Sequence, residues 1–73
     1  MDRIVPIARF AVPLGGQQIE LQQVEFASGG LSLLRVRIRE GRRFTIFDID
    51  PGTAALWGAA MRDWAASRPE GAA

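Results

Sequence analysis

Hydrophobic and polar residues alternate along much of the first fifty positions, and a period of two is typical of β-strands. Four extended segments are predicted, at residues 3–12, 17–26, 31–39 and 42–49, and a turn containing glycine separates each from the next. Pro6 and Pro13 interrupt and follow the first segment. Because proline cannot donate a hydrogen bond to a neighbouring strand, the first segment is expected to lie at an edge of the sheet.

After Asp50 the apolar spacing becomes helical, and Pro51 suits the first position of a helix that the Asp50 carboxylate would cap, with Thr53 as a second candidate cap. Both tryptophans are expected to anchor this helix in the core. The side that packs on the sheet is predicted to carry Leu56, Trp57, Ala60, Met61 and Trp64. The whole pattern predicts an α+β fold, in which a four-stranded antiparallel β-meander precedes one C-terminal α-helix packed on a sheet face. Residues 1–68 are predicted to form this single domain, and residues 69–73 a disordered tail.

The register of the last hairpin decides which side chains share a face of the sheet. A three-residue loop of Arg39, Glu40 and Gly41 is predicted, because a two-residue loop of Glu40 and Gly41 would force a glutamate into a positive φ. Val36 would then pair with Phe44. The second face would be apolar at the end far from the loop, where Leu33 meets Phe47 and Leu31 meets Ile49.

One helix covers only one face of a sheet, and the sequence does not indicate which face this is. Monomers rarely leave a large apolar surface in water, so a second copy is expected to cover the remaining face. The pairing could use sheet faces, edge strands or exchanged segments. The residues predicted for this dimer face are Val24, Phe26, Leu31, Leu33, Phe47 and Ile49.

Composition narrows the functional classes. The chain has 73 residues, of which 48% are hydrophobic and 23% charged, a composition typical of a globular protein. A chain this short buries only a small core, so a partner subunit is expected to add stability. It contains neither cysteine nor histidine, and therefore lacks disulfides, thiolate metal sites and the commonest general base. Its net charge is only +1. No transmembrane segment or signal peptide is predicted, so a cytoplasmic location is expected.

The stretch FDIDPGT, residues 47–53, superficially resembles the nucleophile motif of the haloacid-dehalogenase-like hydrolases. In that family glycine directly follows the second aspartate, whereas Pro51 intervenes here, and the chain has none of the lysine that such an enzyme needs. Asp48 and Asp50 alone also supply too few oxygens for magnesium. We therefore expect no enzyme activity, no cofactor and no metal. Asp48 is left without an assigned partner; Arg3, Arg9 or a residue of a second subunit are the candidates.

Arginines dominate the third and fourth segments, and the candidate interaction surface consists of Arg35, Arg37, Arg39, Arg42 and Arg43. Arginines that alternate along a strand can follow phosphates, and Phe44 or Phe47 could stack on a base. The same alternation is also typical of a solvated sheet face, whose arginines would pair with Glu20, Glu25 and Glu40 on nearby strands. A protein-interaction or accessory module is therefore expected, with a nucleic-acid-binding module as the alternative.

The stretch LLRVRIREGRRFTIFDIDPGTAALWGAAM, residues 33–61, is similar to a family of short bacterial proteins, proteobacterial in type, whose function is unknown. The resemblance covers the C-terminal two-thirds of the chain. It implies a small protein that stands alone, and it transfers no activity, cofactor or binding residue.

Overall fold

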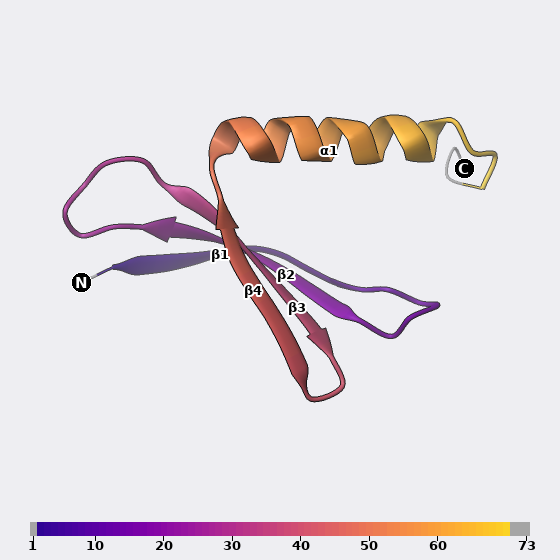
Figure 1. Cartoon of the computed structure of the whole chain (residues 1–73), viewed down its shortest axis with the longest axis horizontal. Helices are drawn as coiled ribbons and strands as arrows, with labels where there is room; N and C mark the ends of the chain where they lie inside the picture. Colours follow the sequence, from indigo (N-terminus) through magenta and orange to yellow (C-terminus); the bar gives the residue numbers. More distant parts are fainter. Residues whose placement is uncertain (1, 71–73) are drawn as a thin grey trace.

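The computed structural model describes residues 2–70, so the last three positions of the expected disordered tail lie outside the described residues. Its four strands are β1 (Arg3–Ala11), β2 (Gln18–Glu25), β3 (Leu33–Glu40) and β4 (Arg43–Ile49), followed by the helix α1 (Pro51–Ala66). The strands pair antiparallel in the order β1-β2-β3-β4 (Figure 1). The predicted meander with one C-terminal helix is therefore confirmed.

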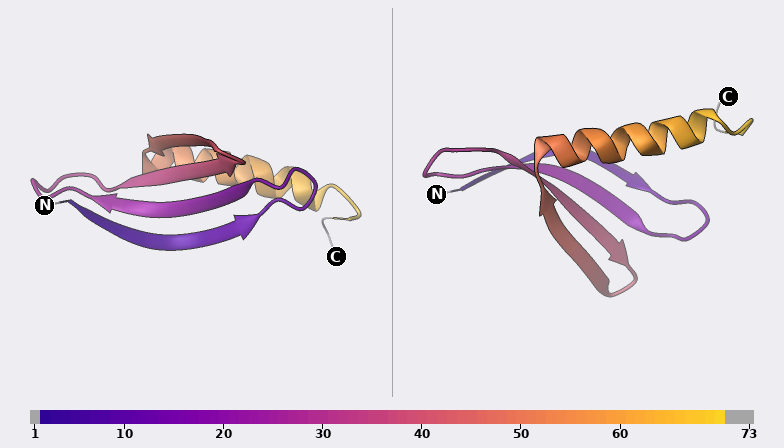
Figure 2. Two further views of the ribbon diagram at one scale, coloured as in Figure 1. Left: turned by 90° about the horizontal axis from the view of Figure 1, so that it is seen from below. Right: turned by 45° about the horizontal axis from the view of Figure 1, so that its top comes forward.

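The sheet is strongly twisted, so that the β1–β2 hairpin and the β3–β4 hairpin point in diverging directions (Figure 1). The strand β1 lies at one edge, as predicted, and its register with β2 shifts between Pro6 and Ala8. The strand β4 forms the other edge. From below, α1 runs behind the sheet along one of its two faces (Figure 2). This face is called the helix side below, and the opposite face the open side.

The register predicted for the last hairpin is wrong. Glu40 pairs with Arg43, which leaves a two-residue turn of Gly41 and Arg42. Gly41 has a φ of 60° and takes the first central position of this turn, where a type II′ hairpin requires glycine. The two-residue turn excluded above contained Glu40, whereas the observed turn begins one residue later, at Gly41. Glu40 therefore does not have to adopt a positive φ.

Each β3 residue pairs with a β4 residue three positions further along the chain than predicted. A shift by an odd number of residues moves every β4 side chain to the other face of the sheet. On the helix side Val36 lies opposite Phe47, and Leu34 lies opposite Ile49. On the open side three pairs of opposite residues bring arginines beside both apolar and acidic side chains: Arg39 with Phe44, Arg37 with Ile46, and Arg35 with Asp48.

The core of the molecule is small. Within residues 2–70 only Val24 and Val36 are fully buried, and they lie on opposite faces, because Val24 pairs with Leu33 and Val36 with Leu21. The helix buries none of its residues. The two faces of the sheet therefore each hold one buried valine instead of a continuous interior.

The helix begins as predicted, with Asp50 as its cap and Pro51 in its first turn. Its predicted packing is only partly correct. Trp57 contacts Phe47 with ring centroids 6.0 Å apart, yet 41% of its surface stays exposed. Trp64 is 64% exposed under the guanidinium of Arg68, and Leu56 is 77% exposed. The tryptophans are thus not core residues, because α1 runs over the sheet without closing onto it.

The shape of the chain agrees with this open packing. Its radius of gyration is 14.3 Å, whereas a compact domain of this length has about 11 Å. Its three principal extents are 46, 30 and 16 Å. The molecule is a thin, elongated plate, so most side chains reach the surface. In the part of the chain that the structure describes, no helix is both long and apolar enough to cross a bilayer.

Candidate functional site

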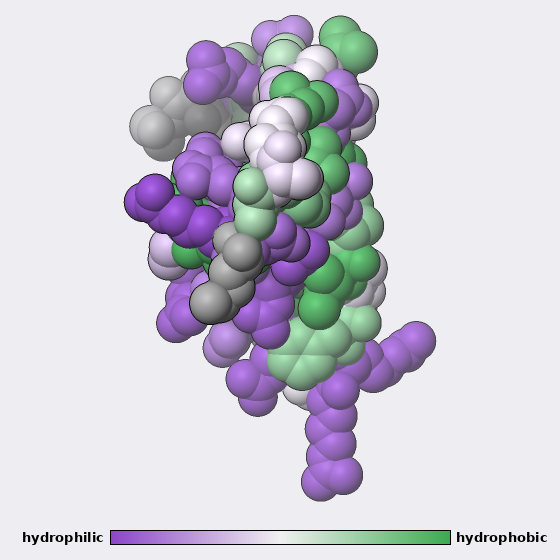
Figure 3. All heavy atoms as spheres, turned by 90° about the vertical axis from the view of Figure 1, so that its left-hand side faces the viewer, coloured by the Kyte–Doolittle hydropathy of each residue, from purple (hydrophilic) through white to green (hydrophobic). Residues whose placement is uncertain are grey.

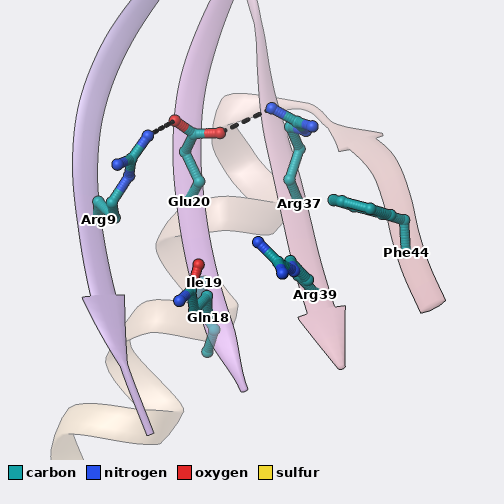
Figure 4. Close-up of a pocket in the computed structure, with 7 residues that line it drawn as sticks. All are labelled: Arg9, Gln18, Ile19, Glu20, Arg37, Arg39 and Phe44. Atoms are coloured by element: carbon teal, nitrogen blue, oxygen red, sulfur yellow. Dashed lines mark hydrogen bonds and ion pairs between the residues drawn. The ribbon is translucent and has the colours of Figure 1, made fainter. Parts of the chain in front are cut away.

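A row of charged side chains crosses the open side of the sheet. The carboxylate of Glu20 on β2 accepts hydrogen bonds from Arg9 on β1 at 3.3 Å and from Arg37 on β3 at 2.9 Å. Figure 4 shows Glu20 between the two guanidinium groups, with α1 behind the sheet. The register explains this geometry, because Arg9 and Arg37 both lie directly opposite Glu20. Three adjacent strands are therefore joined by one acidic side chain.

The row ends on β4 at an aromatic ring. The guanidinium carbon of Arg37 lies 5.6 Å from the centroid of Phe44, which is 55% exposed. Arg39 is close by on β3 and donates to the Gly41 carbonyl at 3.1 Å. These side chains surround a shallow hollow lined by Arg9, Gln18, Ile19, Glu20, Arg37, Arg39 and Phe44 (Figure 4). The Glu20 carboxylate offsets part of the positive charge of the arginines that line the hollow.

Asp48 has a partner that the predicted register concealed. Arg35 donates from Nε and from one terminal nitrogen to the two Asp48 oxygens, at 2.8 and 3.0 Å. This two-pronged bond holds the pKa of Asp48 below its ordinary value. Arg3 does not fill that role, since it pairs with Glu25 at 3.7 Å. The correct register alone would have found Arg35, because it lies opposite Asp48.

The second aspartate of the D-x-D stretch performs a different task. Asp50 accepts hydrogen bonds from the hydroxyl and the backbone N–H of Thr53, and these bonds lower its pKa. Asp48 therefore joins two strands, while Asp50 starts the helix. Among the described residues no three acidic side chains come together as a metal site would require.

The predicted arginine surface divides into two groups. Arg35 and Arg37 lie within the sheet and bind carboxylates, as described above. Arg39, Arg42 and Arg43 lie at the tip of the β3–β4 hairpin and form no ion pair with any residue in the 2–70 range. The three arginines at the tip are called the hairpin tip below. Cross-strand acids pair with the two inner arginines of the predicted surface, whereas the hairpin tip has no carboxylate partner among residues 2–70.

A groove with an almost entirely apolar lining lies between α1 and the helix side of the sheet. Its volume is about 250 Å³, larger than the roughly 150 Å³ of an apolar cavity that holds benzene. Trp57, Gly58 and Met61 form its helix wall. Its sheet wall is built from side chains of all four strands: Phe10, Ile19, Leu21, Leu34, Val36, Ile38 and Ile49. The sequence analysis missed this groove because the helical spacing predicted closed packing.

The six residues predicted for a dimer face do not share one surface. Val24 and Leu33 lie opposite each other on the open side, whereas Phe47 and Ile49 lie on the helix side. Phe26 and Leu31 belong to the connection between β2 and β3. In the end-on view of Figure 3, hydrophobic side chains instead gather in a band beside hydrophilic ones. Exposed apolar residues are thus abundant, but the observed strand register divides the predicted set between the two faces of the sheet.

Comparisons with known proteins identify a family without a known function. No curated protein matches the chain. No solved structure matches it either. One family model, described as a family of unknown function, matches residues 1–67. The similarity therefore extends over nearly the whole chain and not only over its C-terminal two-thirds. With its four-stranded meander and single helix, the chain belongs to the family of unknown function DUF6967.

Proposed function

We propose that this protein is a non-enzymatic homodimer that acts as a protein-interaction or accessory module. The observation that carries the proposal is the excess of exposed surface. The chain has an accessible surface of 5859 Å², whereas a folded monomer of 8.0 kDa has about 4,450 Å². The excess of about 1,400 Å² is more than the roughly 800 Å² that one partner contributes to a standard interface.

The chemistry of this surface also favours association. Exposed large apolar side chains occur on both edge strands, β1 and β4, and along α1, among them Phe10, Phe44, Ile46, Met61 and Trp64. Burying an apolar surface contributes about 25 cal/mol per Å². With two fully buried residues in the described chain, the protomer has little other means of removing apolar area from water. A second copy offers the same apolar area in return.

The acidic residues support a structural role over a catalytic one. Asp48 and Asp50 are both hydrogen-bonded, and the pKa of each is lowered. A carboxyl group that exchanges protons in catalysis near neutral pH needs the opposite shift. The two aspartates therefore serve the hairpin and the helix start.

The experiment is sedimentation across a wide concentration range, with tryptophan emission recorded on the same samples. Dimerisation should raise the mass to twice that of the chain and shift the emission to shorter wavelength as apolar surface is covered. A Met61→Glu variant places a charge in the groove and should weaken a dimer that covers it, whereas Leu14→Glu alters a fully exposed side chain and serves as its matched control. A chain that stays monomeric at high concentration would refute the proposal.

A second candidate function, nucleic-acid binding, is favoured by one observation. The hairpin tip carries three arginines without carboxylate partners among residues 2–70, next to the exposed ring of Phe44. Such a tip could hold backbone phosphates while a base stacks on the ring.

Electrophoretic retardation of single-stranded and duplex probes tests this candidate at low and moderate salt. Binding that is lost in Arg42→Gln/Arg43→Gln, and kept in Arg62→Gln/Arg68→Gln, would support it, because both variants lose two charges. No retardation by the unaltered chain at low salt would eliminate it.

A further inference from the structure

The two edges of the sheet are built differently. At one edge, β1 contains Pro6, and its pairing with β2 shifts between Pro6 and Ala8. Proline and an irregular register are two devices that prevent an edge strand from pairing with another chain. At the other edge, β4 has seven residues in unbroken register with β3 and contains no proline. The edge at β4 therefore carries neither of these protections.

Side chains on both faces of β4 are apolar and accessible. Phe44 and Ile46 are 55% and 53% exposed on the open side, and Phe47 is 37% exposed on the helix side. Within β4, Ile49 at the end of the strand is half-buried, and the other six residues are exposed. An unpaired edge strand that carries accessible apolar side chains is a template for another strand.

The corrected turn also tells which backbone groups of β4 face outward. In a hairpin closed by a two-residue turn, the flanking residues, here Glu40 and Arg43, form a hydrogen-bonded pair. Backbone direction alternates from there, so Thr45 and Phe47 face β3. The N–H and C=O groups of Phe44, Ile46 and Asp48 face away from the sheet. These three residues are called the outward set.

We propose that two copies of the chain pair β4 with β4 in antiparallel orientation, about a two-fold axis at Thr45, to form one continuous eight-stranded sheet. This inference rests on the proposed homodimer and specifies how the homodimer forms. An axis at Thr45 places Phe44 of one copy opposite Ile46 of the other, and both belong to the outward set. Backbone hydrogen bonds can therefore form on both sides of the axis.

Charge and symmetry favour a second copy as the occupant of this edge. The same register places Arg42 of each copy opposite Asp48 of the other. Arg42 forms no ion pair within residues 2–70, and the Asp48 carboxylate, which accepts from Arg35 of its own chain, has lone pairs left for a second donor. Opposite charges across a strand pair are favourable. A two-fold interface requires one self-complementary patch, which β4 provides. The surface excess calculated above leaves room for the area that such a pairing buries.

The test uses two kinds of variant of the full chain. Ile46→Pro removes an outward N–H that the β3–β4 ladder does not use, and circular dichroism verifies that the fold is retained. By symmetry the dimer loses two hydrogen bonds, so its dissociation constant should rise by about 30-fold.

The second variant, Thr45→Cys, introduces the chain's only thiol at a site that lies on the proposed axis. Opposite residues in a pair without hydrogen bonds have closely spaced Cβ atoms, so oxidation should rapidly form a disulfide-linked dimer. Ala8→Cys on the β1 edge is the matched control, because it is also exposed and lies on a strand.

The outcomes separate the two proposals. A dimer that Ile46→Pro weakens and that Thr45→Cys, but not Ala8→Cys, cross-links supports the β4 pairing. A dimer with an unchanged dissociation constant in Ile46→Pro, or equal cross-linking at both thiols, overturns the β4 pairing but leaves the homodimer standing. An edge that instead binds a foreign peptide while the chain stays monomeric overturns both.

Discussion

Arg35 and Asp48 lie opposite each other on β3 and β4, and two hydrogen bonds of 2.8 and 3.0 Å join their side chains. The pair locks the end of the hairpin nearest the helix, while the turn at Gly41 locks the other end. Both features belong to the same register, and a shift of one residue would separate Arg35 from Asp48. This pair therefore reports directly on whether the hairpin is correctly aligned.

A double-mutant cycle should show that Arg35 and Asp48 are coupled. We expect Asp48→Asn and Arg35→Gln to destabilise the chain by amounts that do not add, because each removes the same two-pronged bond. The pair Arg3 and Glu25 is the control, since its atoms are 3.7 Å apart and more exposed. Urea unfolding of the four chains in each cycle measures the coupling. Equal coupling in both pairs would contradict the structural role assigned to Asp48.

Stability should fall in acid because of Asp48 and Asp50. Hydrogen bonds from Arg35 and Thr53 lower the two folded-state pKa values below the ordinary value of 3.8. A depressed carboxyl pKa contributes stability that is fully present above the unfolded value and is lost as the pH falls through the folded value. The free energy of unfolding should therefore decrease below about pH 4.

The variant Asp48→Asn isolates one part of this acid dependence. Its slope between pH 4 and pH 2, taken as an approximate window, should be shallower than that of the unaltered chain. Chemical denaturation at several pH values provides the measurement. Identical slopes would show that the Arg35–Asp48 bond does not form in solution.

Replacement of Gly41 by alanine should destabilise the hairpin. The φ of 60° at this position is costly for an L-residue, and the open space around it makes the effect purely conformational. We expect a loss of about 1 kcal/mol for Gly41→Ala. A D-alanine at position 41, introduced by chemical synthesis, favours positive φ and should restore or raise the stability. Thermal unfolding compares the three chains, and an equal loss with both alanines would refute the positive φ.

Val36 should be worth more than the exposed aliphatic residues. It is one of two fully buried side chains in the described chain, with 2% of its surface accessible. Val36→Ala should cost about 2 kcal/mol through lost burial and the cavity left behind. Leu14→Ala, at a side chain that is 102% exposed, should change the stability by less than about 0.5 kcal/mol. Similar losses in both variants would mean that the packing around Val36 is not formed.

The sequence was informative where local chemistry decides the structure. Pro6 predicted an edge strand, glycines marked the turns, and Asp50 with Pro51 marked the helix start, because each acts on its own backbone or its immediate neighbours. Alternation within a strand shows which of its side chains share a face. It does not show which face of β4 lies beside which face of β3, because a change of one residue in the turn reverses that match.

The candidate surfaces depended on that relation. Asp48 had no partner and the predicted dimer residues shared a face only in the wrong register. The exposure of Trp57 and Trp64 could not be predicted from the sequence for another reason. Helical spacing shows that a face is apolar, but not how closely the helix approaches the sheet.

The meander order of the strands has a consequence for how the molecule forms. Each strand pairs with its neighbour along the chain, so every loop that must close before pairing is short and costs little chain entropy. Folding with such local contacts is fast. The four strands can assemble as successive hairpins from either end, and α1 adds little to the process. Under the proposed pairing, the slow step is therefore the association of two folded chains, and its rate depends on the protein concentration.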